Sequence, residues 1–204
     1  MSVKLLLLSS SQGRMRLLQE ANIAFQVIPH TSLEDRSPVG LSPEELVVAI
    51  AQDKMQTLVL PPLPATTTEI LILAADTLVF ASDGEVCGKP ENEQEARRML
   101  EKFSTSPINV VTGCCLQKMQ RNKLQQWEVV ATRTFSGKAG LLYAVPKEAY
   151  AEYFEAIANF LNIAGGAQVE GYGAQFVQWI NGSYTTIQGL PMFELREELK
   201  AIGF

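Results

Sequence analysis

Apolar residues dominate two stretches of the chain, residues 3–8 and residues 70–80. Runs of this kind are typical of strands that are covered on both faces, as in a parallel sheet. The second run, "ILILAADTLVF", carries a single carboxylate, Asp76, which Thr77 follows. Because a buried, unpaired carboxylate is strongly unfavourable, such a group is usually neutralised, paired or bound to a cation. The pattern therefore indicates either an Asp that accepts turn hydrogen bonds at a strand end or a carboxylate kept for function.

Apolar positions three and four residues apart predict helices between these runs. One helix follows the first strand and ends near Asn22. A second begins at Ser42, where Pro43 and Glu45 provide a first-turn proline and a capping box, and it ends near Lys54. Three more helices are predicted over residues 91–103, from Pro146 onward, and over residues 192–201.

Further strands are predicted over residues 24–30, 108–119 and 126–137, and a hairpin turn over residues 81–90. The segment 163–191 is rich in glycine and is predicted to be loop-like around short strands. No repeat, low-complexity tract or linker interrupts the alternation of strands and helices. We therefore expect a single α/β domain over residues 1–204, with two lobes around a cleft as an open alternative.

Composition and charge narrow the classes of function. The 204 residues are 47% hydrophobic, which is enough for a substantial core, and the net charge of −5 disfavours a broad cationic surface for a nucleic-acid polymer. Three cysteines, Cys87, Cys114 and Cys115, lack zinc-site spacing and suit a reducing compartment. The apolar N-terminal run is too short for a signal peptide, and no stretch is long enough to cross a membrane. These features predict a soluble, cytoplasmic protein that binds no membrane.

A candidate phosphate site lies between the first strand and the first helix, in "LLLLSSSQGRMRLL". The N-terminus of a helix offers unpaired backbone N–H groups, and small residues such as Ser9 and Ser11 let a phosphate approach closely. Arg14 in the first turn can add a charged, bidentate contact. The alternative is an ordinary N-cap serine beside a solvated arginine.

Other charged residues admit a functional and a plain interpretation. Lys54 can act on a substrate or simply stabilise the C-terminus of its helix. Lys89 lies between a glycine and a proline in a turn, where a lysine is usually solvated. Glu34 and Asp35 lie in a loop, where solvation is again the default. Glu170 lies among glycines that let backbone approach a flat ligand, or that only form turns.

Together these stretches resemble the Maf family of nucleoside triphosphate pyrophosphatases, once described as septum-formation inhibitors. The most specific part, "AADTLVFASDGEVCGKPENEQEARRMLEKFSTSPINVVTGCCL", is similar to the ADT, DGE, GKP, helix and VVTG motifs of that family in order. The segment "INGSYTTIQGLPMFEL" is similar to its GSY…GLP ending. The resemblance covers nearly the whole chain. It implies an elongated α/β fold with a mixed, twisted sheet and a cleft between two lobes, similar to inosine triphosphatases.

The resemblance assigns roles to named residues. In the family motif S-x-S-P-R-R, Ser9, Ser11 and Arg14 match the serines and the second arginine, whereas Gln12 and Gly13 replace the proline and the first arginine. The family has a lysine at the end of the second helix, and Lys54 matches it. Asp76 matches the carboxylate of the ADT motif, and Lys89 matches the lysine of the GKP motif. The acidic pair of the family is matched by Glu34 and Asp35 in swapped order.

The mechanism implied by the resemblance releases a nucleoside monophosphate and pyrophosphate from standard or modified nucleoside triphosphates. Asp76 activates the attacking water, either as general base or as a metal-bound carboxylate. A divalent cation, Mg²⁺ or alternatively Mn²⁺, is held by Asp76 with Glu34 or Asp35. Arg14, Lys54 and Lys89 offset phosphate charge. If both lysines are exposed, replacing either one is expected to leave the melting temperature almost unchanged.

The preferred base stays open. The family branch that acts on thymidine and uridine triphosphates has Thr after the key Asp, as Thr77 here, but has Gln where this chain has Glu170. The branch that acts on 7-methyl-GTP has Glu at that position and Gln after the Asp. This chain is mixed, and a lysine of the first branch is Ile163. The competing hypotheses are a non-catalytic nucleotide-binding regulator of cell division and a generic small-molecule binder, and a homodimer is left open.

Overall fold

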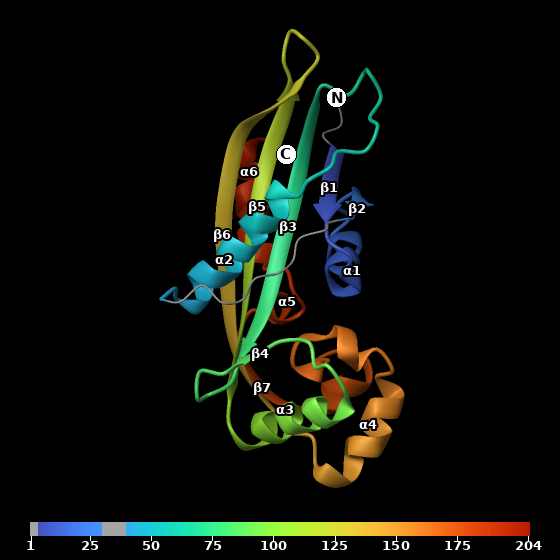
Figure 1. Cartoon of the computed structure of the whole chain (residues 1–204), viewed down its shortest axis with the longest axis vertical. Helices are drawn as coiled ribbons and strands as arrows, with labels where there is room; N and C mark the ends of the chain where they lie inside the picture. Colours follow the sequence, from blue (N-terminus) through green and yellow to red (C-terminus); the bar gives the residue numbers. More distant parts are fainter. Residues whose placement is uncertain (1–3, 30–39) are drawn as a thin grey trace. The chain divides into compact units, whose positions relative to one another are not determined.

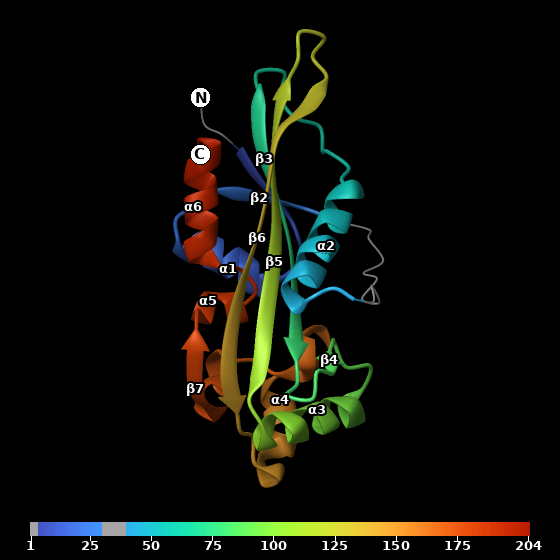
Figure 2. The ribbon, with the colours of Figure 1, turned by 90° about the vertical axis from the view of Figure 1, so that its left-hand side faces the viewer.

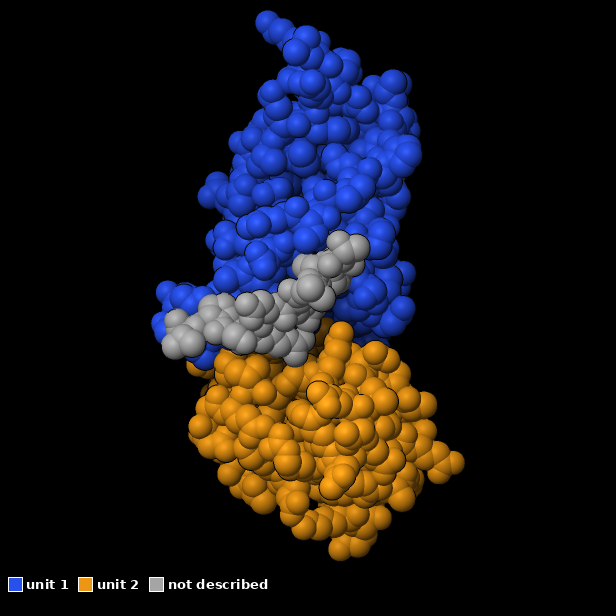
Figure 3. Space-filling model, viewed as in Figure 1, with its two compact units in different colours: residues 1–76, 112–137, 189–204 blue, residues 77–111, 138–188 orange. Residues whose placement is uncertain are grey.

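The computed structural model describes residues 4–29 and 40–204. Contacts divide the chain into two compact units that interleave along the sequence (Figure 3). Unit 1 contains residues 1–76, 112–137 and 189–204, and unit 2 contains residues 77–111 and 138–188. The single domain expected over residues 1–204, the elongated shape and the cleft stay predictions.

The strands of the described chain form one mixed sheet (Figure 1). Its order is β2-β1-β3-β5-β6-β7, with β4 beside β3. β1 pairs in parallel with β2 and β3, whereas β3–β4 and β6–β7 are antiparallel. The α/β class with a mixed sheet is therefore confirmed. The strands are β1 (Lys4–Leu8), β2 (Phe25–Ile28), β3 (Glu69–Phe80), β4 (Val86–Cys87), β5 (Ile108–Arg121), β6 (Trp127–Tyr143) and β7 (Val177–Gly182).

The structure confirms one predicted helix start and shifts another. Ser42 caps α2, with its hydroxyl accepting from the Glu45 amide at 3.3 Å and the Glu45 carboxylate accepting from the Ser42 amide at 2.8 Å, which confirms the capping box. The helix predicted to begin at Pro146 begins only at Tyr150, because a turn of 3₁₀ helix, η1 (Lys147–Ala149), comes first. The α-helices are α1 (Gln12–Glu20), α2 (Pro43–Gln56), α3 (Glu93–Thr105), α4 (Tyr150–Ala156), α5 (Tyr184–Ile187) and α6 (Met192–Ile202).

In unit 1 the apolar strands are covered on both faces, as their sequence predicts. Leu5 and Leu7 of β1 and Leu71 and Leu73 of β3 share a buried cluster with residues of α1 and α6. The alternate side chains of these two strands share a second cluster with α2 and residues that follow it. Figure 2 shows α2 on one side of the strands and α1 and α6 on the other. Because successive side chains of a strand point to opposite faces, the uninterrupted apolar runs follow directly from this arrangement.

Unit 2 has a separate core that is rich in aromatic side chains. α3 contributes Phe103 to it, β6 contributes Tyr143, and α4 contributes Tyr153 and Phe154. The glycine-rich segment, predicted to be loop-like, folds over this core as three short 3₁₀ helices, η2 (Phe160–Asn162), η3 (Ala164–Gly166) and η4 (Gly171–Phe176), before β7. In the part of the chain that the structure describes, no helix is long and apolar enough to span a membrane.

Candidate active site

A buried ion pair between Lys54 and Asp76 forms the centre of the candidate site. The Lys54 ammonium donates to Asp76 Oδ1 at 2.7 Å and to the Ala75 carbonyl at 3.3 Å. Only 2% of Lys54 and 4% of Asp76 is exposed. The carboxylate in the apolar strand is therefore balanced by a cation from a helix 22 residues earlier in the chain.

Strand and helix periodicity explain why these two side chains meet. Side chains at alternate positions of a strand share a face, so Asp76 follows Ile72 and Ala74 on the face of β3 that packs against Ala51 of α2. In α2 the buried positions include Val47, Ile50, Ala51 and Lys54, which is one face at helical spacing. Lys54 thus continues the apolar stripe of its helix into the sheet.

The burial of Lys54 bears on two sequence-based expectations. Lys54 lies in the last turn of α2, but its ammonium is inside the fold with Asp76 rather than in solvent near the helix end. An almost unchanged melting temperature was expected only for an exposed lysine, so it does not apply to Lys54, whose removal would leave a buried carboxylate uncompensated and lower the melting temperature. Lys89, by contrast, is exposed, as its turn predicts.

The second oxygen of the Asp76 carboxylate is also buried. Oδ2 has no hydrogen-bond partner within residues 4–29 and 40–204. Buried carboxylate oxygens normally accept a hydrogen bond or bind a cation, so an orphaned oxygen marks a place where a water, a donor or a metal ion fits. Oδ2 is therefore a chemically suitable ligand for a hard divalent cation.

A complete metal site is not formed by the described residues. They contain no group of three or more His, Cys, Asp or Glu side chains that could hold an ion. The other two predicted ligands, Glu34 and Asp35, lie outside the described residues. Asp76 is the predicted metal ligand that the structure describes, and its orphaned oxygen fits that role.

Gly113 on β5 lets α2 approach the sheet closely enough for this pair to form. A Cβ atom at Gly113 would lie 2.5 Å from the carbonyl carbon of Val47 and 2.5 Å from the amide nitrogen of Val48. These are backbone atoms, which cannot rotate away. The strand predicted over residues 108–119 contains this glycine, and a glycine inside a strand is a recognised signal of close backbone approach.

The serine loop before α1 forms a compact polar cluster. Ser11 caps the helix, with its hydroxyl 3.5 Å from the Arg14 amide. The Arg14 guanidinium is buried, and it donates to Ser9 Oγ at 2.8 Å and to the Gly189 carbonyl at 2.8 Å. Arg14 therefore ties the loop to the "GLP" segment, a contact that no local signal in the sequence reveals. Ser9 is itself buried, and its hydroxyl also accepts from the Ser11 amide at 3.3 Å.

The parallel pairing of β1 and β3 places the serine loop and Asp76 at the same edge of the sheet. Leu8, the last residue of β1, pairs with Ala74, so Ser9 and Asp76 both follow the last pair of this register. The carboxyl ends of parallel strands are the usual ligand-binding edge of an α/β sheet. Among the described residues, unit 1 thus contains five of the predicted site residues, namely Ser9, Ser11, Arg14, Lys54 and Asp76.

Thr77, Lys89 and Glu170 belong to unit 2. Thr77 and Glu170 are partly buried, and Lys89 lies in the turn after β4. The backbone on both sides of Lys89 is fixed within that unit. The Gly88 carbonyl accepts from the Gly165 amide at 2.8 Å, and Pro90 is buried against Gly166. The exposed lysine therefore extends from a rigid turn.

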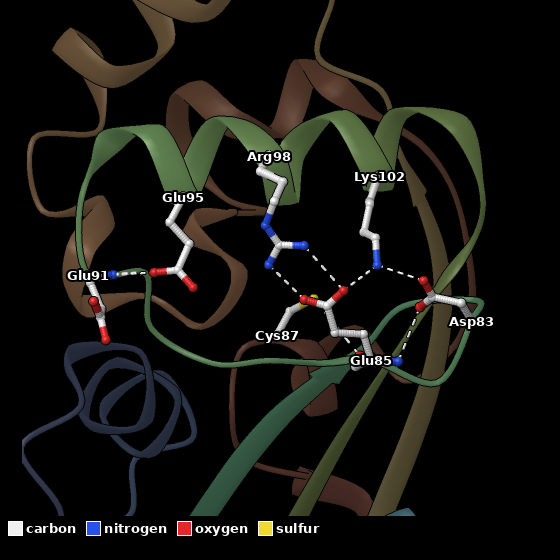
Figure 4. A network of polar contacts seen from close by, with 7 residues as sticks. All are labelled: Asp83, Glu85, Cys87, Glu91, Glu95, Arg98 and Lys102. Atoms are coloured by element: carbon white, nitrogen blue, oxygen red, sulfur yellow. Dashed lines mark hydrogen bonds and ion pairs between the residues drawn. The ribbon is translucent and has the colours of Figure 1, made fainter.

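An ionic network attaches the β3–β4 hairpin to α3 (Figure 4). Glu85 accepts from both guanidinium NH groups of Arg98, at 2.6 and 3.2 Å, and also from Lys102. Lys102 donates in addition to Asp83 at 2.6 Å. The hydrogen bonds from Arg98, followed by those from Lys102, lower the pKa of Glu85 from 4.5 to about 2. The "DGE" motif thus holds the hairpin that leads into the Lys89 turn.

The cysteines do not contribute a nucleophile. All three are buried and unbridged. Burial raises the pKa of both Cys87 and Cys115 to about 11, and it raises the pKa of Cys114 further. Because the thiolate is the reactive form, these thiols are inert packing groups.

The comparisons with known proteins establish the family. The sequence model of the Maf family, described as "Maf-like protein", matches residues 4–202, so the chain belongs to this family. The "dTTP/UTP pyrophosphatase" of Caldicellulosiruptor bescii is 33% identical over 98% of this chain and 96% of its own. The protein of the same name from Syntrophus aciditrophicus is 34% identical over 98% of this chain and 90% of its own.

Among solved structures there is a distant likeness to the Ham1 protein of Staphylococcus aureus. The two share 16% identity over 69% of this chain and 72% of the other, with a TM-score of 0.34.

Proposed function

We propose that this Maf-family chain is a nucleoside triphosphate pyrophosphatase. The observation that carries the proposal is the Asp76 carboxylate, which is held by a buried lysine at one oxygen and whose buried second oxygen has no hydrogen-bond partner among the residues that the structure describes. A carboxylate that is fixed and charge-balanced in an apolar strand has no packing advantage over an apolar residue. Its retention is explained by chemistry at Oδ2.

The reaction breaks the anhydride bond between the α- and β-phosphates. Water attacks the α-phosphorus, its proton passes to a base, and the products are a nucleoside monophosphate and pyrophosphate. Asp76 Oδ2 takes the proton or orients the water, and Lys54 holds Oδ1 so that the carboxylate keeps one orientation. The ammonium also balances the carboxylate charge when the anionic substrate approaches.

The phosphates are bound by residues assigned through the family resemblance. The sequence assigns one phosphate to Ser9 and the helix N-terminus, but Ser9 is buried and its hydroxyl accepts from Arg14, so here Ser11 and the N-terminus of α1 cradle that phosphate. Arg14 donates to Ser9 Oγ and to the Gly189 carbonyl, so it supports this phosphate site by fixing the serine loop as well as through its charge. Lys89 adds an exposed ammonium from a rigid turn and offsets the charge that develops on the leaving pyrophosphate.

A divalent cation, Mg²⁺ or alternatively Mn²⁺, would complete the site. Asp76 would hold it together with Glu34 or Asp35. When bound, such an ion neutralises triphosphate charge and polarises the phosphorus–oxygen bonds. Asp76 Oδ2 serves either as the base or as the metal ligand, and both roles require an ionised carboxylate.

The names of the relatives favour thymidine and uridine triphosphates as substrates. Thr77 agrees with that branch of the family, but Glu170 replaces an amide that can both donate and accept with an anion that only accepts. Gly13 stands where the family motif has an arginine, so the site that binds the phosphate and the base has one arginine fewer. We therefore expect a broadened base preference rather than strict selection of thymine and uracil.

A non-catalytic regulator is the second candidate function. It is favoured by Gln12 and Gly13, which depart from the arginine-rich family motif. A binding protein has no use for the buried Lys54–Asp76 pair, however, and the catalytic proposal accounts for it.

The test is a screen for pyrophosphate release with Mg²⁺ over dTTP, UTP, GTP, 7-methyl-GTP and the remaining nucleotides. Wild type is expected to be active, and Asp76→Asn is expected to lose at least about 100-fold in kcat, the usual contribution of a general base. Asp53→Asn, one residue before Lys54 and exposed, is the matched control and should retain activity. An inactive wild type, or an Asp76→Asn variant that is as fast as wild type while folded by circular dichroism, would refute the proposal.

A further inference from the structure

Two buried tyrosines of unit 2 meet at their hydroxyl groups. Tyr143 of β6 and Tyr153 of α4 are fully buried, and their hydroxyl oxygens lie 3.0 Å apart. Neither residue lies in the stretches that carry the family resemblance, residues 74–116 and 180–195. Tyrosine hydroxyls are rarely buried without a partner to satisfy, so the pair needs an explanation beyond packing.

Both hydroxyls bind the backbone of one short segment, residues 166–168. Tyr153 donates to the Gly166 carbonyl at 3.0 Å and accepts from the Gln168 amide at 3.2 Å. The Tyr143 hydroxyl proton is in reach of the Gln168 carbonyl at 2.8 Å as well as of Tyr153. Side chains thus supply the hydrogen bonds that a regular strand or helix would supply here.

The neighbouring glycines make this arrangement specific. A Cβ atom on Gly173 would lie 1.7 Å from the Gln168 carbonyl oxygen and 2.6 Å from the Tyr143 hydroxyl. On the other side, the Gly165 amide donates to the Gly88 carbonyl, next to Lys89. The tyrosine hydroxyls, the close packing at Gly173 and the Gly165–Gly88 hydrogen bond therefore all restrain the segment within unit 2.

Glu170 follows this segment by two residues along the chain. Burial is the main reason why the pKa of each tyrosine is raised, and the charge of Glu170 raises both further. Because Glu170 is only two residues from Gln168, a shift of the Gly166–Gln168 backbone would move the side chain of Glu170 as well.

We propose that Tyr143 and Tyr153 are positioning residues that set the place of Glu170 and thereby the choice between pyrimidine and purine nucleoside triphosphates. This inference rests on the proposed function, in which Glu170 contacts the base. The hydroxyl groups act through the 166–168 backbone and touch neither substrate nor metal.

The test measures the ratio of kcat/KM for dTTP to kcat/KM for GTP in wild type, Tyr143→Phe and Tyr153→Phe. Each substitution removes one hydroxyl and keeps the aromatic ring. The ratio is expected to change by about three- to tenfold, through KM, while kcat for the better substrate changes by less than about threefold. Glu170→Gln gives the scale of change for direct loss of the carboxylate.

Tyr150→Phe is the matched control. Tyr150 is buried in the same core and lies on the same helix, but its hydroxyl makes no hydrogen bond to residues 166–168. This variant should keep the wild-type ratio. Amide hydrogen exchange over residues 163–170 should be faster by about tenfold or more in Tyr153→Phe and unchanged in Tyr150→Phe.

The outcomes separate the inference from the proposed function. An inactive wild type refutes the proposed function, and the same ratio is then read as relative Kd for dTTP and GTP by calorimetry. A ratio that does not change in Tyr143→Phe and Tyr153→Phe, whether or not exchange becomes faster, overturns the inference and leaves the tyrosines with a purely structural role. A ratio that changes equally in Tyr150→Phe overturns it as well.

Discussion

At the scale of single residues, the Lys54–Asp76 pair determines how the site must be interpreted. Both charges are almost completely removed from water, and the ammonium nitrogen is 2.7 Å from one carboxylate oxygen. Desolvating two charges offsets most of their mutual attraction, so such a pair adds little net stability, whereas losing one partner leaves a buried charge without compensation. Lys54 is therefore as necessary for the fold around Asp76 as for charge balance during the reaction.

This argument predicts a non-additive effect of substitutions on the free energy of unfolding. Lys54→Met and Asp76→Val are each expected to lower it by about 3–5 kcal/mol, because each leaves the partner buried and unpaired. The double variant should recover most of that loss and stay inactive. Urea denaturation of all four proteins measures the coupling. Single variants with wild-type stability, or a double variant as unstable as the sum of the two, would contradict the buried pair.

At the scale of elements, α2 and β5 are in contact at Gly113. The backbone of Val47 and Val48 occupies the space that a side chain at position 113 would need. This close crossing sets the depth of α2 over its sheet face and hence the position of Lys54 in its last turn. The contact is backbone to backbone, so neighbouring side chains cannot relieve a clash by changing rotamer.

We therefore expect Gly113→Ala to lower the free energy of unfolding by about 1–3 kcal/mol or more, as overpacking does. Pyrophosphate release should fall as well, because α2 carries Lys54. Gly140→Ala on β6 is the control, since the nearest atom to its Cβ would be 3.7 Å away. Chemical denaturation and the pyrophosphate assay on both variants check this. Equal behaviour of the two variants would show that the crossing at Gly113 tolerates a methyl group.

Local patterns were sufficient to predict many elements but not their tertiary partners. The Ser42 capping box and the apolar runs of β1 and β3 act within a few residues, so the sequence showed them directly. β6 continues to Tyr143, past its predicted end at residue 137, because its last residues pair with β7. A partner of this kind lies far along the chain and leaves no local pattern.

The candidate site shows the same division. Asp76 was singled out because a carboxylate in an apolar run is locally anomalous. The burial of Lys54 could have been predicted from its phase with Val47 and Ile50, seven and four residues earlier on the same helix face. The link from Arg14 to Gly189 spans 175 residues, and only the fold brings the two together.

At the scale of the whole molecule, acidic residues exceed basic ones, with 22 against 17. Stability toward acid therefore depends on which carboxylates are held ionised by cations. Glu85, with Arg98 and Lys102, is such a group (Figure 4). Its folded pKa of about 2 is below the ordinary value of 4.5, so the folded state releases this proton more readily than the unfolded state does. Its contribution is complete above about pH 4.5 and is lost as pH falls toward 2.

We predict that Glu85→Gln melts about 2–4 °C below wild type at pH 7, which corresponds to about 1 kcal/mol for a partly solvent-screened network. At pH 3 the gap should shrink by more than half, because wild type has then lost most of the same contribution. Thermal melting at the two pH values measures the difference. Glu91→Gln is the control, because no ion pair holds the Glu91 carboxylate among the residues described. A gap that is the same at both pH values would show that the Glu85 network does not govern acid stability.

The Lys54–Asp76 pair also has a consequence for descent. Two apolar residues in place of the pair would fold about as well, so drift alone could remove it from a copy that no longer needs catalysis. The path there passes through a chain with only one of the two changes, which is the least stable of the four combinations. A lineage that retains both charges either still uses them for catalysis or has not yet passed through the unstable single-substitution state. Related chains that have lost activity are therefore expected to show the two positions changed together, and this paired substitution would mark the loss of catalysis.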